Sequence, residues 1–151
     1  MKLKFTIGLF ILFALGSCSS NEDSSTNEKE MNEVRVIAQS STWQITSFID
    51  SGNDETNHFS GYSFTFNNNG TITASNGTQT YTGTWSVTNS NSNDDNSNDI
   101  HFNIRFTTPT TFDDDLTEDW NIVSKSNSKI ELIHISGGNG GTDTLTFENI
   151  S

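Results

Sequence analysis

Residues Phe59–Thr88 read FSGYSFTFNNNGTITASNGTQTYTGTWSVT and carry the clearest structural pattern of the chain. Apolar residues recur there at every second position, in three runs: Tyr62, Phe64 and Phe66; Ile72 and Ala74; Tyr81, Gly83, Trp85 and Val87. Because successive side chains of a strand point to opposite faces, this period of two predicts three strands with one buried face each. Asn69-Gly70 and Asn76-Gly77 separate the runs and predict tight hairpins with positive φ at both residues.

The same alternation continues on both sides of this meander. Upstream, Trp43, Ile45, Ser47 and Ile49 share one parity, which predicts a first strand with Phe48 on its opposite face. Downstream, four more segments fit strands: Ile100–Phe106, Trp120–Val123, Ile130–Ile135 and Thr144–Phe147. An antiparallel meander of about eight strands removes its exposed edges by closing into a barrel. We therefore predict an all-β, up-and-down antiparallel barrel; a β-sandwich is the alternative, although sandwiches of immunoglobulin type need Greek-key crossovers.

The remaining segments are predicted to be connections and one helix. Asn27 followed by Glu30 resembles an N-cap with its partner, and the apolar residues from Met31 to Ala38 share one helical face, so we predict a short helix over residues 28–38. Polar connections are expected at 50–57 and 107–116, and a long mobile hairpin loop at 89–99.

Composition narrows the possible functions. The chain has 151 residues, enough for one domain after removal of a leader, and a formal net charge of −12. This acidity argues against binding to nucleic acid or to anionic lipid, because both need Lys and Arg. The single cysteine excludes an internal disulfide and a cysteine-based zinc site.

The N-terminus is typical of an exported protein. Basic residues precede an apolar run over residues 5–15, which is too short to span a bilayer because a spanning helix needs about 20 residues. Leu15-Gly16-Ser17-Cys18 then resembles the lipobox of bacterial lipoproteins, which implies lipidation of Cys18 and anchoring to a membrane. We therefore divide the chain into a signal peptide (1–17), a polar tether (18–26) and a barrel domain (27–151).

The residues after Cys18 indicate where in the cell envelope the protein is located. Ser19 fits sorting to the outer membrane, by resemblance to known sorting rules, and removal of the leader with Lys2 and Lys4 takes the net charge from −12 to −14. Asn21-Glu22-Asp23 resembles the acidic export tags of surface lipoproteins, and a plain polar tether is an equally good interpretation. We expect a lipid-anchored protein of the cell envelope at the outer membrane, with surface exposure left open.

Over residues 27–151 the sequence resembles the lipocalin-like domains of small bacterial envelope lipoproteins, a family mostly of uncharacterised function. The resemblance rests on the following residues: Trp43, Asp54-Glu55-Thr56, Phe59, Gly61–Phe66, Gly83–Val87, Leu116–Trp120, Ile130–Leu132 and Thr144–Phe147. It implies a calycin-type barrel and binding of an apolar ligand, with no catalytic residues to carry over. The chain departs from true lipocalins at Ser41-Thr42-Trp43, where they carry Gly-x-Trp, and it lacks their disulfides.

Chemical motifs point to no enzyme. His58, His101 and His134 are scattered without the spacing of a metal pair, and phosphate-loop, dinucleotide-binding and nucleophile-elbow motifs are absent from the sequence. Two acidic clusters are predicted to lie in loops: Asp113-Asp114-Asp115 with Glu118 and Asp119, and Asp94-Asp95 with Asp99. A solvated loop is the favoured interpretation, and calcium binding is the alternative. We predict no catalytic residue, no cofactor, no metal site, no nucleic-acid partner and a monomer.

The function of the barrel depends on how the inward-facing aromatic residues pack. They fill the barrel as a solid core, or they line a cavity for one small hydrophobic ligand. The predicted function is hydrophobic ligand binding, and the alternative is a structural or adhesion-type surface module that acts through its loops. The candidate pocket-lining residues are Trp43, Phe64, Phe66, Trp85, Phe102 and Trp120.

Overall fold

The structure is a computed structural model that describes residues 22–89, 99–138 and 140–150. Cys18, the signal peptide and most of the predicted 89–99 loop lie outside these residues. Within them the elements run α1 (Glu22–Gln39), β1 (Thr42–Asp50), β2 (Asn53–Asp54), η1 (Thr56–Phe59), β3 (Ser63–Phe66), β4 (Thr71–Ser75), β5 (Thr80–Asn89), β6 (Ile100–Arg105), α2 (Thr110–Leu116), β7 (Glu118–Lys125), β8 (Lys129–Ile135) and β9 (Thr142–Asn149).

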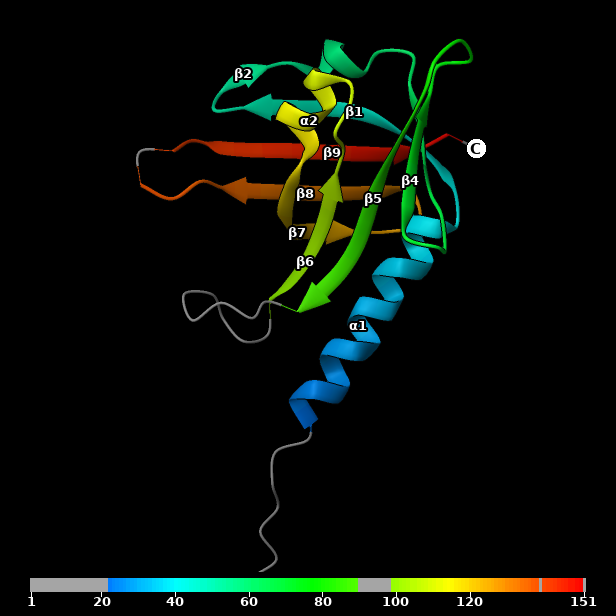
Figure 1. The fold of residues 1–151 in the computed structure, drawn as a ribbon. Coiled ribbons are helices and arrows are strands. Elements are labelled where there is room, and N and C mark those ends of the chain that lie inside the picture. Colours follow the sequence, from blue (N-terminus) through cyan, green and yellow to red (C-terminus); the bar gives the residue numbers. More distant parts are fainter. Residues whose placement is uncertain (1–21, 90–98, 139, 151) are drawn as a thin grey trace, which may run out of the picture.

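The strands form a closed antiparallel barrel, as predicted (Figure 1). Strands β3 to β9 pair in sequence order, β1 pairs with β3 on one side, and β9 pairs with β1 on the other. This β1–β9 pairing closes the sheet and leaves eight strands in the barrel. The two-residue strand β2 is additional and pairs with the end of β1.

The central meander is confirmed, with one correction at its turns. Strand β3 pairs with β4, and β4 with β5, so that Phe64 lies opposite Ala74 and Ile72 opposite Gly83. Gly70 and Gly77 have φ values of 80° and 84°, as a tight reversal requires. The asparagines before them do not share this conformation, because Ser51 is the one non-glycine residue with positive φ in the described ranges.

The predicted inner parity of β1 is wrong in its second half. A β-bulge between Ile45 and Ser47 changes the register with β9. An extra residue in one strand reverses the faces of everything after it. Phe48 is therefore buried at 2% exposure, whereas Ile49 is only partly buried.

Helix α1 begins earlier than predicted. It starts at Glu22, inside the segment assigned to the tether, so Asn27 is a helical residue rather than the N-cap. Once a helix is nucleated, each added residue extends it at little cost, and no Gly or Pro interrupts this stretch. The helix docks on the barrel through its second half, where Arg35 Nη2 donates to the Val87 carbonyl at 2.6 Å. The starting end of the helix extends beyond the barrel (Figure 1).

Two predicted connections contain short helices that bring apolar side chains to one end of the barrel. The 50–57 connection holds β2 and the start of η1, whose Phe59 is fully buried. The 107–116 connection holds α2, which buries Phe112 and Leu116. The Phe59 and Phe112 rings lie 5.4 Å apart, so the two segments pack on each other. None of the described helices has the length and hydropathy needed to cross a membrane.

Candidate functional site

The predicted pocket-lining aromatic residues are packed against one another. All six are buried, with exposed fractions from 0% to 6%: Trp43, Phe64, Phe66, Trp85, Phe102 and Trp120. The Phe66 ring contacts those of Trp85, Phe102 and Phe147 at centroid distances of 5.1, 5.3 and 5.5 Å. Edge-to-face pairs at such distances are the packing expected of an aromatic core.

The three tryptophans are also fixed by hydrogen bonds. Each indole N–H donates to a backbone carbonyl, at 2.8 Å for Trp43, 2.9 Å for Trp85 and 3.2 Å for Trp120. A buried N–H that already has a partner costs free energy to redirect toward a ligand. These side chains are therefore held in their core orientations.

The aromatic core reaches the surface beside η1 and α2. The Tyr62 ring lies 5.1 Å from Phe112 and 6.0 Å from Tyr81. The Tyr62 hydroxyl donates to Gln79 at 3.1 Å, and burial, followed by the nearby Tyr81, raises its pKa above the ordinary value.

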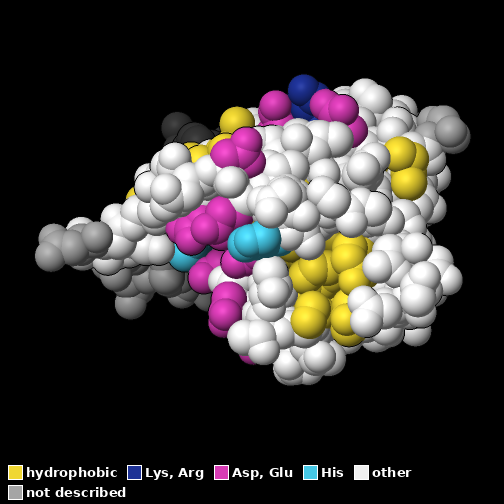
Figure 2. Space-filling model, turned by 90° about the horizontal axis from the view of Figure 1, so that it is seen from above, with side chains coloured by type: hydrophobic (Ala, Val, Ile, Leu, Met, Phe, Trp, Pro, Cys, Tyr) yellow, Lys and Arg dark blue, Asp and Glu magenta, His cyan; other side chains and the backbone are white. Residues whose placement is uncertain are grey.

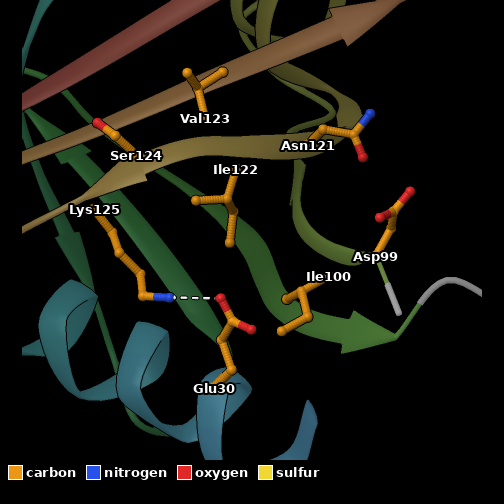
Figure 3. Close-up of a pocket in the computed structure, with 8 residues that line it drawn as sticks. All are labelled: Glu30, Asp99, Ile100, Asn121, Ile122, Val123, Ser124 and Lys125. Carbon is orange, nitrogen blue, oxygen red and sulfur yellow. Dashed lines mark hydrogen bonds and ion pairs between the residues drawn. The ribbon is translucent and has the colours of Figure 1, made fainter. Parts of the chain in front are cut away.

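One open groove lies between α1 and the paired strands β6 and β7 (Figure 3). It has a volume of about 330 Å³. Ile100 and Ile122 point into it, whereas Val123 points away (Figure 3). Lys125 Nζ reaches Glu30 on α1 at 2.8 Å and forms one wall. Apolar side chains beside an ion pair can hold a small amphipathic group.

Trp85 lines two further grooves on the outside of the barrel. One, of about 210 Å³, lies under the end of α1 beside Arg35 and Gln39. The other, of about 400 Å³, lies along β5 and β6 and includes Asn103 and Arg105. Both are open and shallow, and both are lined mainly by polar side chains.

The structure brings acidic residues to His58. Its Nδ1 lies 2.8 Å from Asp115 Oδ2 and 3.7 Å from Glu55 Oε2. The shorter distance is a hydrogen bond between α2 and the helical turn η1. The ring also packs edge-on against Phe59 at 6.3 Å.

A second group surrounds His134 on β8. Its Nε2 lies 3.4 Å from Glu118 Oε2, and its Nδ1 lies 3.7 Å from Asp143 Oδ2. Asp143 accepts a hydrogen bond from the Ser51 backbone N–H at 2.9 Å. Asp119 joins the group, because one ligand atom each from Glu118, Asp119 and His134 lies within 4.8 Å of the others. Sequence spacing alone missed this convergence.

The parity of the strands, however, contains a signal for this group. Glu118 continues the inward parity of Trp120 on β7, His134 that of Ile130 and Leu132 on β8, and Asp143 that of Leu145 on β9. Three neighbouring strands thus place a polar, ionisable residue where the apolar pattern ends. Convergence at one end of the barrel follows from the pairing of these strands.

The acidic run Asp113–Asp115 does not form the predicted loop. These residues lie in α2, where successive side chains point in different directions around the helix axis. Asp113 and Asp114 are exposed, and Asp115 turns to His58. This arrangement does not gather the six to eight oxygen ligands that calcium takes. The other acidic run, Asp94-Asp95, lies outside the described residues.

Seen from above, acidic side chains gather beside histidine and next to an apolar patch (Figure 2). The class of protein defined by these features is a small closed antiparallel β-barrel with a packed aromatic interior and histidine–carboxylate groups at its surface.

Comparisons with known proteins found similarity among solved structures alone. No protein-family model matches the chain, and no curated protein matches it. A crystal structure of a DUF4847 family protein from Bacteroides vulgatus is similar to it, with 19% identity and a TM-score of 0.48. The alignment covers 76% of this chain and 96% of that one.

Proposed function

We propose that this protein is a lipid-anchored envelope protein whose barrel is a non-enzymatic module that acts through its outer surface and loops. The supporting observation is the interior, where the Phe66 ring meets three other rings within 5.5 Å and the tryptophan N–H groups are all bonded to backbone. Close-packed interiors leave few voids larger than a water molecule. A module of this kind presents its grooves and loops rather than a lumen.

The anchor in this proposal is Cys18, for which the supporting evidence is the lipobox-like sequence before it. Two or more acyl chains hold a protein stably on a membrane, since each buried CH₂ contributes about 0.8 kcal/mol. Mass spectrometry of the N-terminal peptide from membrane fractions tests this: we expect a diacylglyceryl mass on Cys18 that is absent from Cys18→Ser. An unmodified Cys18 peptide, or a chain that keeps its leader, would refute the anchor.

Surface display on the outer membrane is the proposed location. Limited protease treatment of intact cells separates the two orientations, with an epitope in the periplasm as the control for membrane integrity. Loss of the barrel domain from intact cells supports outward display. Protection of the domain until the cells are broken supports a periplasmic orientation and removes adhesion from the proposal.

Binding of a small hydrophobic ligand is the second candidate function. The observation that favours it is the position of Trp85, which belongs to the aromatic core and also lines two surface grooves. Native mass spectrometry of the full-length protein extracted in detergent distinguishes the two functions. A bare protein mass after incubation with fatty acids, sterols, haem and quinones supports the surface module. A discrete adduct that is lost on denaturation supports ligand binding and identifies the class of ligand.

A further inference from the structure

We infer that Glu118, Asp119 and His134 form a binding site for one zinc ion at an end of the barrel. The three residues come from two neighbouring strands, since Glu118 and Asp119 begin β7 and His134 lies near the end of β8. Their side chains supply one imidazole nitrogen and two carboxylate groups. Imidazole with carboxylate is a donor set that zinc takes, usually at four-coordinate sites.

The distances fit a shared metal ion better than they fit a hydrogen bond. His134 Nε2 and Glu118 Oε2 are 3.4 Å apart, longer than the about 2.7–2.9 Å of a charge-assisted hydrogen bond. Two ligands bound to zinc at about 2.0–2.1 Å in a tetrahedral arrangement are about 3.3–3.4 Å apart. Asp119 lies within 4.8 Å of both other ligand atoms, and its side chain is 60% exposed, so it has room to rotate inward.

A carboxylate lies behind the second ring nitrogen of His134, at a distance too long for a hydrogen bond. His134 Nδ1 is buried without a hydrogen-bond partner in the described part of the chain, and it faces Asp143 Oδ2 at 3.7 Å. Asp143 is itself held by the Ser51 backbone N–H. Closing this distance to a hydrogen bond on metal binding would fix the tautomer and orientation of the ligating imidazole. The Trp120 ring packs edge-on against the same imidazole at 6.1 Å.

Charge supports the same assignment. Glu118, Asp119 and Asp143 converge here, and their ion-pair partners among the described residues are His134 and His101 alone. Carboxylates that share a site repel one another unless a cation compensates them. Zinc is favoured over calcium, because calcium takes six to eight oxygen ligands and this site has three protein ligands, one of them nitrogen.

The His58 group provides a matched control. It has the same residue types, Glu55, His58 and Asp115, but its Nδ1 is already hydrogen-bonded to Asp115 at 2.8 Å. No second carboxylate is described behind its other ring nitrogen. We therefore assign the zinc ion to His134 and expect His58→Gln to leave zinc binding intact.

The test measures zinc bound to tag-free, full-length protein in detergent, by equilibrium dialysis and elemental mass spectrometry. We expect one zinc per chain in the wild type and in His58→Gln. His134→Gln and Glu118→Gln should lose stoichiometric binding, and Asp143→Asn should bind about 10–100-fold more weakly because it alters only the outer contact. Nitrogen NMR of the histidine side chains should show one imidazole shifting on addition of zinc.

Two results would overturn the assignment. Absence of zinc from the wild type at stoichiometric concentrations would remove the site altogether. Loss of zinc in His58→Gln with retention in His134→Gln would place the ion at the other group. If His134→Gln fails to fold, as judged by circular dichroism, Glu118→Gln carries the same test, because its side chain is 37% exposed and tolerates the isosteric change.

Discussion

Truncation of Phe66 to alanine tests whether the barrel interior is a packed core. The side chain is 2% exposed and meets the rings of Trp85, Phe102 and Phe147. A buried aromatic side chain removes about 150–250 Å² from water, which at about 25 cal/mol per Å² corresponds to roughly 4–6 kcal/mol. Measured Phe→Ala costs in protein cores are about 3–5 kcal/mol. We therefore expect a loss of about 4 kcal/mol in the free energy of unfolding.

Urea denaturation followed by tryptophan fluorescence measures this loss, with the m-value as a check on two-state unfolding. Val123→Ala is the control, because Val123 is 60% exposed on β7 and should change stability by less than about 0.5 kcal/mol. A cost below about 1 kcal/mol for Phe66→Ala would refute a packed interior. It would mean that the ring already borders empty space, as it does in a ligand-binding barrel. Should the alanine variant not fold, Phe66→Leu gives a smaller cost of the same sign.

Three further changes test other contacts. Gly83→Ala on β5 should lower the stability of the protein by about 1–3 kcal/mol, because a Cβ there would lie 2.4 Å from the Arg105 carbonyl oxygen on β6. Thermal denaturation measures this loss, and unchanged stability would contradict the close approach. Trp43→Phe should cost about 1–3 kcal/mol, because a buried carbonyl of α1 loses its donor; urea midpoints check this. Hydrogen bonds from Thr56 lower the pKa of Asp54, so its contribution to stability is present above the unfolded-state pKa of about 4 and is lost as pH falls through the lower folded-state value. The advantage of wild type over Asp54→Asn should therefore shrink in acid, and a difference that is constant with pH would contradict this.

Much of the fold could be predicted because the chain alternates so regularly. Strands β3 to β9 follow from period-two runs separated by polar connections, three of which contain glycine, and the barrel follows from the absence of long crossovers. These features are local, so neighbouring residues suffice to reveal them. The start of α1 at Glu22 was missed because the first part of the helix is polar and shows no apolar face from which a helix can be predicted.

The errors fall where distant pairing decides the structure. Phe48 is buried because β1 bulges against β9, and nothing between Trp43 and Asp50 marks that bulge in the sequence. Helix α2 forms where Phe112 finds an apolar site against Phe59, more than fifty positions away. Both outcomes depend on contacts that form only after the barrel closes. Local patterns cannot report them.

The histidine–carboxylate group at His134 was predictable from the sequence only in part. Glu118, His134 and Asp143 occupy inward positions of β7, β8 and β9, whereas Asp119 lies on the outward parity of β7. The parity of these residues is visible in the sequence, but only the register places them together. The group also contacts the β1–β9 seam of the barrel. Asp143 is the second residue of the closing strand β9, and it accepts a hydrogen bond from the backbone N–H of Ser51, which directly follows β1.

This position gives the proposed zinc ion a structural consequence beyond binding. Pairing of β1 with β9 joins the two ends of the domain and is the most non-local contact of the barrel, so it carries the largest cost in chain entropy. An ion on Glu118 and His134 would orient the imidazole toward Asp143, and through Asp143 it would hold the turn after β1. A ligand that binds only the folded state stabilises it in proportion to its concentration and affinity. The proposed site would therefore stabilise the barrel at the contact that its chain forms at greatest cost.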